Sequence, residues 1–342
     1  KADLTQIFVQ MKLSVIDNEE SEKVVPRISE YANTQNRVQA ADFFSNHAYH
    51  IRMEEFSRRL WAPAGKGAQR ETKWFYERAR GQYADAQAKL TPAEQKRFKA
   101  ENPKPQMLTK TDLAKFENVW DDHPRYVNLG AEKNFARYAA RIGKEWDKSS
   151  GSFNEAYFKR AVARGIIFRA TERIVSAQPW YNNGYRANIV AYTLAVLSEL
   201  TRRQEKSLDF QRVWNAQAIS PVLESTIAVV ASRVNDDLLR PMQGISNISE
   251  WAKREACWTR MLENMDEFAD LLPDEFDGEC LSRDDHLSEK RAARITQKVD
   301  NGIEAQTKVF AIPAARWIAV HETLAAKRLL TPKEIGILNV AM

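Results

Sequence analysis

The sequence has 342 residues, of which 44% are hydrophobic and 28% are charged, and this composition predicts a globular protein with a sizeable core rather than a disordered or fibrous chain. Its formal net charge of +5 is a mild basic excess, which is compatible with an anionic partner but does not identify one. Cys257 and Cys280 form no CxxC pair, which argues against a disulfide scaffold or a cysteine zinc site and fits a reducing cytoplasm, and no apolar run reaches the roughly 18 residues of a membrane-spanning helix.

The N-terminal half begins with a predicted strand and continues with helices. Residues 7–16 alternate between apolar and polar side chains, which is typical of a half-buried strand. Helical spacing predicts a helix over 51–61. The sequence Thr91-Pro-Ala-Glu94 is a capping box with proline at the first helical position, so a helix begins there and ends before Pro103. Thr109 is the predicted N-cap of a further helix.

The C-terminal half is predicted to be helical throughout. It follows a short polar linker, Lys148–Ser152. The predicted helices cover residues 153–175, 186–202, 221–234, 288–307, 314–329 and a final segment capped by Thr331. The helix over 186–202 is apolar on most sides, so we expect it to be central. The acidic stretch 272–285 contains Pro273 and Gly278 and is typical of a surface loop.

These elements predict a mainly α fold with a small β element near the N-terminus. The length of the chain exceeds what one core usually accommodates, so we expect two packed lobes. The predicted boundary is the polar linker. Residues 1–148 form an α+β lobe in this prediction, and residues 149–342 form a helical lobe.

Residues 33–83 concentrate the side chains that recognise ligands. Asn33, Gln35 and Asn36 both donate and accept hydrogen bonds, as contacts to a base edge, ribose or phosphate require. The alternative is a loop whose amides cap its own backbone. The predicted contacts to nucleic acid or a nucleotide are Asn33, Gln35, Asn36, Asn46, Trp74, Tyr76, Arg78, Arg80 and Gln82.

The segment 74–83 interleaves aromatic rings with arginines. Guanidinium groups bind phosphates while rings stack on bases, a combination typical of single-stranded nucleic acid or nucleotide sites. From Arg58 to Arg80 basic residues also greatly outnumber acidic ones. The alternative is structural: the rings pack the lobe and Glu77 pairs with an arginine.

His47, His50 and Glu54 have the spacing of side chains on one helical face, which is compatible with a divalent metal as cofactor. The chain has no HExxH motif, and a pair of hydrogen-bonded structural histidines is the competing interpretation. We find no nucleophile elbow, no phosphate-cradling glycine loop and no cluster of carboxylates with a nearby lysine. The residues therefore give no independent case for catalysis.

Three blocks in this region resemble a known family. Asn33–Asn36, Ala41–His47 and Trp74–Tyr83 are similar to the signature blocks of the abortive infection phage resistance (AIPR) family, and the resemblance extends from about Phe8 to about Ala195. It implies a bacterial anti-phage defence protein, often found beside restriction-modification genes. Family members usually have a substantial upstream region that is sometimes nuclease-like, so we expect this chain to be the C-terminal portion of a longer protein.

Three functions remain open. The first is a cytoplasmic defence protein that recognises nucleic acid or a nucleotide through residues 33–83. The second is a metal-dependent nuclease completed by the upstream region. The third is a scaffold that senses a phage protein through its helical lobe, with restriction-modification components as further candidate partners. None of the three involves a membrane.

Overall fold

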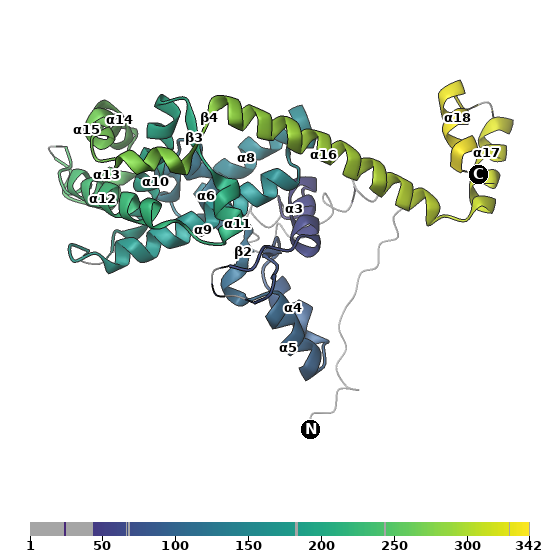
Figure 1. Ribbon diagram of the computed structural model, residues 1–342, viewed down its shortest axis with the longest axis horizontal. Helices are drawn as coiled ribbons and strands as arrows, with labels where there is room; N and C mark the ends of the chain where they lie inside the picture. Colours follow the sequence, from purple (N-terminus) through teal and green to yellow (C-terminus); the bar gives the residue numbers. More distant parts are fainter. Residues whose placement is uncertain are drawn as a thin grey trace.

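The computed structural model describes Val24 and residues 44–341 except 66, 68, 182, 183, 243 and 328. Helices dominate the described chain (Figure 1), where β-structure consists of two sheets of two strands each and one isolated bridge between Ala62 and Thr72. The mainly α class predicted from the sequence is therefore confirmed. The strand predicted over 7–16 lies outside the described residues.

The helices of the N-terminal half follow local capping signals. Thr91 completes a capping box with Glu94, and Thr109 accepts a hydrogen bond from the backbone amide of Asp112. The helix predicted over 51–61 is confirmed, although it begins three residues earlier. The elements are α3 (Ala48–Arg59), α4 (Gln82–Ala88), α5 (Pro92–Glu101), η2 (Lys104–Gln106), α6 (Lys110–Trp120), α7 (Pro124–Val127), α8 (Ala131–Ser149) and η3 (Ser150–Ser152).

The C-terminal half is helical as predicted, and its caps are again local. Ser220 accepts a hydrogen bond from the amide of Leu223, and Thr331 forms a second capping box with Glu334. The helices are α9 (Glu155–Ala177), α10 (Arg186–Arg203), α11 (Phe210–Ala216), α12 (Pro221–Leu238), α13 (Ile248–Ala252), α14 (Glu255–Glu263), α15 (Met265–Ala269), α16 (Arg283–Phe310), α17 (Ala314–Ala326) and α18 (Pro332–Ala341).

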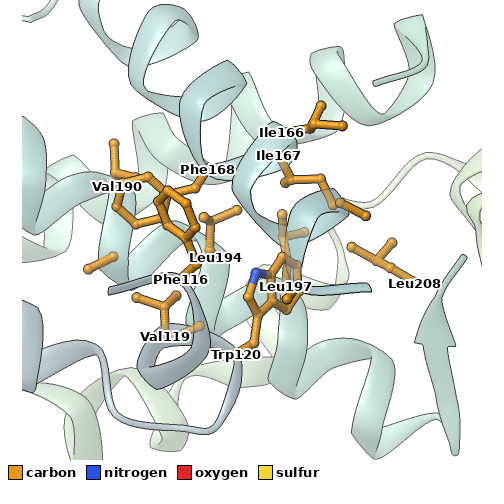
Figure 2. Close-up of a cluster of buried hydrophobic side chains, with 14 of the residues drawn as sticks. Phe116, Val119, Trp120, Ile166, Ile167, Phe168, Val190, Leu194, Leu197 and Leu208 are labelled. Carbon is orange, nitrogen blue, oxygen red and sulfur yellow. The ribbon is translucent and has the colours of Figure 1, made fainter. Parts of the chain in front are cut away.

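The core is built around α10, which packs against α6, α9 and α12. Figure 2 shows Leu194 and Leu197 of α10 beside Phe116 and Trp120 of α6. The buried cluster continues on both sides of the predicted boundary at residue 148, from Tyr49 of α3 to Phe276. The boundary itself stays a prediction; the predicted linker forms the end of α8 and the short helix η3.

Two short ladders join segments that are distant in the sequence. Strand β1 (Phe75–Glu77) pairs in parallel with β2 (Met107–Thr109), so α4 and α5 form an excursion between them that extends from the helical body (Figure 1). Strand β3 (Lys206–Leu208) pairs antiparallel with β4 (Cys280–Ser282).

The prediction of a surface loop over 272–285 was wrong. This stretch forms η4 (Asp274–Glu279), β4 and the start of α16, and both Phe276 and Glu279 are buried. The reason is non-local: β4 finds its partner in β3, more than 70 residues earlier. A prediction from local composition has no access to that pairing.

Helix α16 leaves the body at the β3–β4 ladder and runs outward to α17 and α18 at its far end (Figure 1). Apolar side chains on this projection are exposed, including Phe310, Leu329 and Ile337. Within the described residues, every helix is too short or too polar to cross a bilayer.

Candidate functional site

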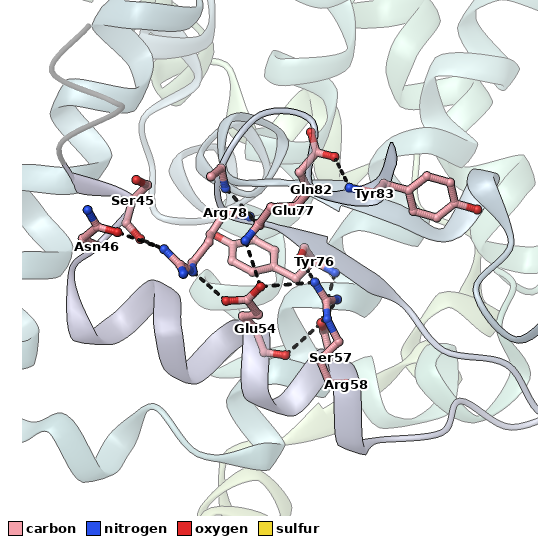
Figure 3. Close-up of polar contacts among 11 residues, drawn as sticks. Ser45, Asn46, Glu54, Ser57, Arg58, Tyr76, Glu77, Arg78, Gln82 and Tyr83 are labelled. Atoms are coloured by element: carbon pink, nitrogen blue, oxygen red, sulfur yellow. Dashed lines mark hydrogen bonds and ion pairs between the residues drawn. The ribbon is translucent and has the colours of Figure 1, made fainter. Parts of the chain in front are cut away.

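The segment 44–83 is held together by one carboxylate, that of Glu54 on α3 (Figure 3). Its Oε2 accepts a hydrogen bond from Arg78 Nε at 2.6 Å. Its Oε1 accepts from Gln82 Nε2 at 3.0 Å and from Arg58 Nη2 at 3.2 Å. Charge-assisted hydrogen bonds are the stronger class, so Glu54 fixes β1 and the start of α4 against α3.

The turn that follows β1 is built from its own side chains. Glu77 accepts hydrogen bonds from the backbone amides of Gly81 and Tyr83, at 3.2 and 3.0 Å. Gln82 Oε1 accepts from the amides of Arg78 and Ala79, at 2.9 and 3.1 Å. The pairing of Glu77 with an arginine that the sequence suggested is thus replaced by backbone capping. This frees Arg78 to pair with Glu54.

Arg78 also reaches the residues that precede α3. Its Nη1 donates to Asn46 Oδ1 at 3.0 Å and to the carbonyl oxygen of Ser45 at 3.3 Å. The structure therefore brings together three of the predicted contact residues, Asn46, Arg78 and Gln82. All three lie around Glu54, which the sequence analysis had assigned to a metal site.

The two predicted aromatic contacts are in the interior. Trp74 is 5% exposed, and its indole nitrogen donates to Gln217 Oε1 at 2.8 Å. Tyr76 has no exposed surface, and its hydroxyl is hydrogen-bonded to His50 Nδ1. In this conformation neither ring offers a face to a base, so a recognition role for the region has to use its polar and charged groups.

The structure does not bring His47, His50 and Glu54 together as ligands of one ion. His47 Nδ1 accepts a hydrogen bond from the amide of Tyr49 and caps α3. His50 points instead at Tyr76, while Glu54 binds the two arginines. Among the described residues, no group of three or more His, Cys, Asp or Glu side chains has an arrangement that would hold a metal.

His50 is a neutral, buried histidine. Burial is the main cause that lowers its pKa to about 3, and the nearby positive charge of Lys110 lowers it further. Its Nε2 atom is buried without a hydrogen-bond partner. Burial likewise raises the pKa of Tyr76 well above its usual range. The pair therefore carries no charge at neutral pH, and its role is to pack and orient α3 against β1.

A second buried polar network lies next to α3, and the sequence analysis missed it. Tyr49 Oη is 3.1 Å from Tyr157 Oη, and Tyr157 donates to Glu117 Oε2 at 3.1 Å. Arg164 Nη1 donates to the same carboxylate oxygen at 2.9 Å. The available signal was weak: Glu117 is a charged residue among the apolar positions of α6, and Arg164 lies on the buried helix α9.

The contacts around Glu54 join it to Asn46, Arg58, Arg78 and Gln82, and we call these five residues the Glu54 cluster.

The exposed cations of the region lie beyond the Glu54 cluster. Arg80 is exposed and forms no ion pair with any described residue. The excursion α4–α5 adds Lys89, Lys96, Lys99 and Lys104, all of them exposed. No residue of α5 is buried. The result is a basic protrusion, which we define as Arg80 together with these four lysines.

Three predicted contacts, Asn33, Gln35 and Asn36, lie outside the described residues. Their assignment to nucleic acid or a nucleotide stays a prediction. The described part of the candidate site consequently has two components. They are the Glu54 cluster and the basic protrusion.

Comparison with known proteins gives one match. A family model described as AIPR protein matches residues 1–242. No curated protein and no solved structure matches the chain.

Proposed function

This chain belongs to the AIPR protein family, which suggests a role in abortive infection and anti-phage defence, and on that premise we propose that it recognises nucleic acid or a nucleotide through residues 33–83 in the bacterial cytoplasm. The observation that carries the proposal is the basic protrusion directly beside the Glu54 cluster. Cations presented on a fixed scaffold are what binding to a phosphate backbone requires.

The cations of the protrusion are available because the structure does not use them elsewhere. Arg80 and Lys99 have no ion-pair partner among the described residues, in contrast to Arg97, which pairs with Glu101 at 2.8 Å. Arg78 is also engaged, by Glu54. We therefore assign phosphate contacts to Arg80 and the lysines, and assign Arg78 the task of positioning the turn that presents Arg80.

The neutral amides have a different part in this proposal. Asn33, Gln35 and Asn36 release no counterions on binding, so they would contribute to the choice of ligand rather than to general affinity. Asn46 and Gln82 sit within the Glu54 cluster and hold it in shape. Trp74 and Tyr76 support it from the interior.

The test is a set of titrations of the whole chain with labelled single-stranded DNA, single-stranded RNA and duplex DNA at several salt concentrations. Arg80→Ala and Lys99→Ala should each weaken binding to unrelated sequences and reduce the salt slope by about one counterion per contact. Asn33→Ala or Gln35→Ala should change the preference among ligands and leave the slope nearly constant. Arg97→Ala combined with Glu101→Ala is the matched control, because it removes an exposed cation together with its carboxylate partner and leaves the net charge unchanged.

Absence of binding by the parent chain would refute the proposal. Equal slopes for the arginine and asparagine variants would refute the division of roles within it. Melting temperatures of all variants, measured in the same buffers, separate loss of binding from loss of folding.

A second candidate function, sensing of a phage protein, is favoured by one observation. The projecting helices expose large apolar side chains, and Phe310 is 84% exposed. Exposed apolar surface of this kind commonly marks a contact with another protein. Phe310→Asp should then abolish protection against phage while nucleic-acid affinity stays unchanged, whereas full protection by the variant would exclude this function for Phe310.

A further inference from the structure

A cavity of about 1130 Å³ lies between the start of α9, the β3–α11 connection and the first turns of α16. Phe153 and Arg160 line one side, Phe210 lies on the second, and Leu281 and Ile295 close the third. The volume lies slightly above the range of about 300–1,000 Å³ that is typical of sites for small organic ligands. None of these residues belongs to the Glu54 cluster or the basic protrusion.

In the polar network beside the cavity, two of the three arginines are paired with carboxylates. Arg141 pairs with Asp121 at 2.5 Å, and Arg164 pairs with Glu117 at 2.9 Å. Arg160, one helical turn before Arg164, has no carboxylate of the described chain within ion-pair distance. Its Nε atom is buried and has no hydrogen-bond partner, which is also true of the other two arginines. Arg160 is half-buried overall, and because it is the arginine of this network without an ion-pair partner in the described chain, it is available to an anion that enters the cavity.

The surroundings of Arg160 are also compatible with binding of an anion. Burial lowers the pKa of its guanidinium and the neighbouring Arg164 lowers it further, while the charges of Glu117 and Asp121 partly offset this effect. The group lies 5.1 Å from the ring centroid of Tyr157. Both side chains line the cavity, so an anion there would meet Arg160 at its wall.

The start of α9 adds to the positive potential at the same place. Asn154 caps this 23-residue helix, and Asn154 and Ala156 both line the cavity. Helix N-termini favour anions, because their amides point outward and the helix dipole is positive there. This feature supports the site that Arg160 and the cavity define.

The cavity also has two carboxylates, which restrict where an anion can bind. Glu145 lies 3.5 Å from Arg141 and is thereby partly neutralised. Glu289 of α16 has a raised pKa, chiefly from burial and then from the charges of Asp209 and Asp285. Arg291 of α16 also lines the cavity but is exposed, so the negative end of a ligand would bind at the half-buried Arg160, and its uncharged part would extend toward α16.

We propose that this cavity binds a small organic phosphate, with the phosphate on Arg160 and the start of α9 and an apolar or aromatic body between Phe210 and Ile295. A nucleoside monophosphate has this chemistry and would occupy part of the cavity. The site is separate from the nucleic-acid surface proposed above and does not depend on it. Binding here would also join α9 to α16, because each provides one wall.

The test is calorimetric titration of the whole chain with adenosine 5′-monophosphate, adenosine and inorganic phosphate. The monophosphate should bind more tightly than either part alone. Arg160→Gln should weaken its binding by about 10- to 100-fold, since a charge-assisted hydrogen bond is lost, and Arg160→Lys should retain part of the affinity. Arg173→Gln is the matched control, because Arg173 is an exposed arginine of the same helix.

Variants of the opposite wall test the body of the ligand. Ile295 is 67% exposed, so Ile295→Asp should fold and should weaken binding of the monophosphate. Leu287→Asp is its control, because Leu287 is an exposed apolar residue of α16 that does not line the cavity. Equal affinities for the monophosphate and inorganic phosphate would overturn the assignment of an organic ligand.

The melting temperature of the unliganded protein distinguishes a ligand-binding cation from a structural one. Arg160→Gln should leave this temperature unchanged or raise it, because Arg160 forms no ion pair with the described chain that the change would break, and one positive charge beside Arg164 is removed. A clear fall would mean that Arg160 serves the fold, and would overturn the proposal. The proposal also fails if neither the monophosphate nor phosphate binds at millimolar concentration, or if Arg173→Gln weakens binding as much as Arg160→Gln.

Discussion

Arg78 Nε lies 2.6 Å from Glu54 Oε2, and this contact joins the residue directly after β1 to the middle of α3 across 24 positions of sequence. The contact gives Arg78 and Arg80 different tasks, although they are two residues apart in one basic motif. Arg78 is engaged by Glu54 and fixes the local structure, while Arg80 is exposed at the surface.

Arg78→Ala should lower the stability of the protein, by about 1–3 kcal/mol, because a partly buried charge-assisted hydrogen bond is lost and Glu54 keeps its negative charge. Arg80→Ala should leave the melting temperature unchanged. Chemical denaturation of both variants measures the difference. Combining Arg78→Ala with Glu54→Gln should cost less than the sum of the two single changes, and strict additivity would contradict the pairing.

Gly165→Ala should destabilise the protein, although alanine is the better helix former. A Cβ at Gly165 would lie 2.9 Å from a ring carbon of Phe116, so α9 and α6 would have to separate, at a cost of about 1–3 kcal/mol. Gly143→Ala in α8 is the control, because a Cβ there meets nothing within 4 Å. That change should stabilise by about 0.5–1 kcal/mol. Opposite shifts in the two melting temperatures are expected, and a stabilising Gly165→Ala would contradict the close packing.

His50 should make the protein less stable in acid. Its pKa is about 3 in the folded protein, below its ordinary value of 6.5, so the unfolded chain binds the proton more readily. The stabilising contribution of neutral His50 is complete above pH 6.5 and is lost as the pH falls toward 3. Between pH 7.5 and 5.5 the loss is about 1.4 kcal/mol.

His50→Gln isolates this effect. The variant can still form a hydrogen bond to Tyr76, but it does not titrate. Its free energy of unfolding should fall less steeply than that of the parent between pH 7.5 and 5.5. His47 and His123, whose pKa values are also lowered by burial, leave a residual slope in both proteins. Identical slopes in parent and variant would show that His50 is not responsible.

Glu117→Gln should be among the most damaging changes to a polar residue. Glu117 is 2% exposed and neutralises Arg164, and removing one charge of a buried pair costs about 3 kcal/mol or more. Glu250→Gln is the control, because Glu250 pairs with Lys253 at the surface and such pairs contribute little. Thermal melts of the two variants provide the comparison, and a Glu117 variant as stable as its control would contradict the role assigned to this network.

The parts of the fold that the sequence predicted are those with local signals. Thr91, Thr109, Ser220 and Thr331 each cap a helix through the residue three positions further on, so short-range patterns were sufficient. The β3–β4 ladder was missed because each strand has three residues and its partner is distant in the sequence. The burial of Phe276, which lies in an acidic stretch, has the same origin.

The candidate site shows the same division. Three of its predicted residues, Asn46, Arg78 and Gln82, lie together around Glu54, a residue that the spacing had grouped with the histidines. Their role in binding stays a prediction. Spacing along a helix indicates which side chains share a face, and it does not indicate what that face contacts. Arg160 had no distinguishing feature in the sequence, because its lack of a partner is a property of the packed structure.

Helix α16 begins directly after β4, so its inclination is set at the β3–β4 ladder. Its 28 residues span about 42 Å, so a change of about 5° in its inclination at the ladder would displace its far end by about 4 Å. The cavity lies along the first half of α16, where Leu281 and Ile295 form part of its wall. A movement of α16 caused by filling or emptying that space would therefore produce a larger displacement at the far end of the helix, at Phe310 and the two helices that follow it.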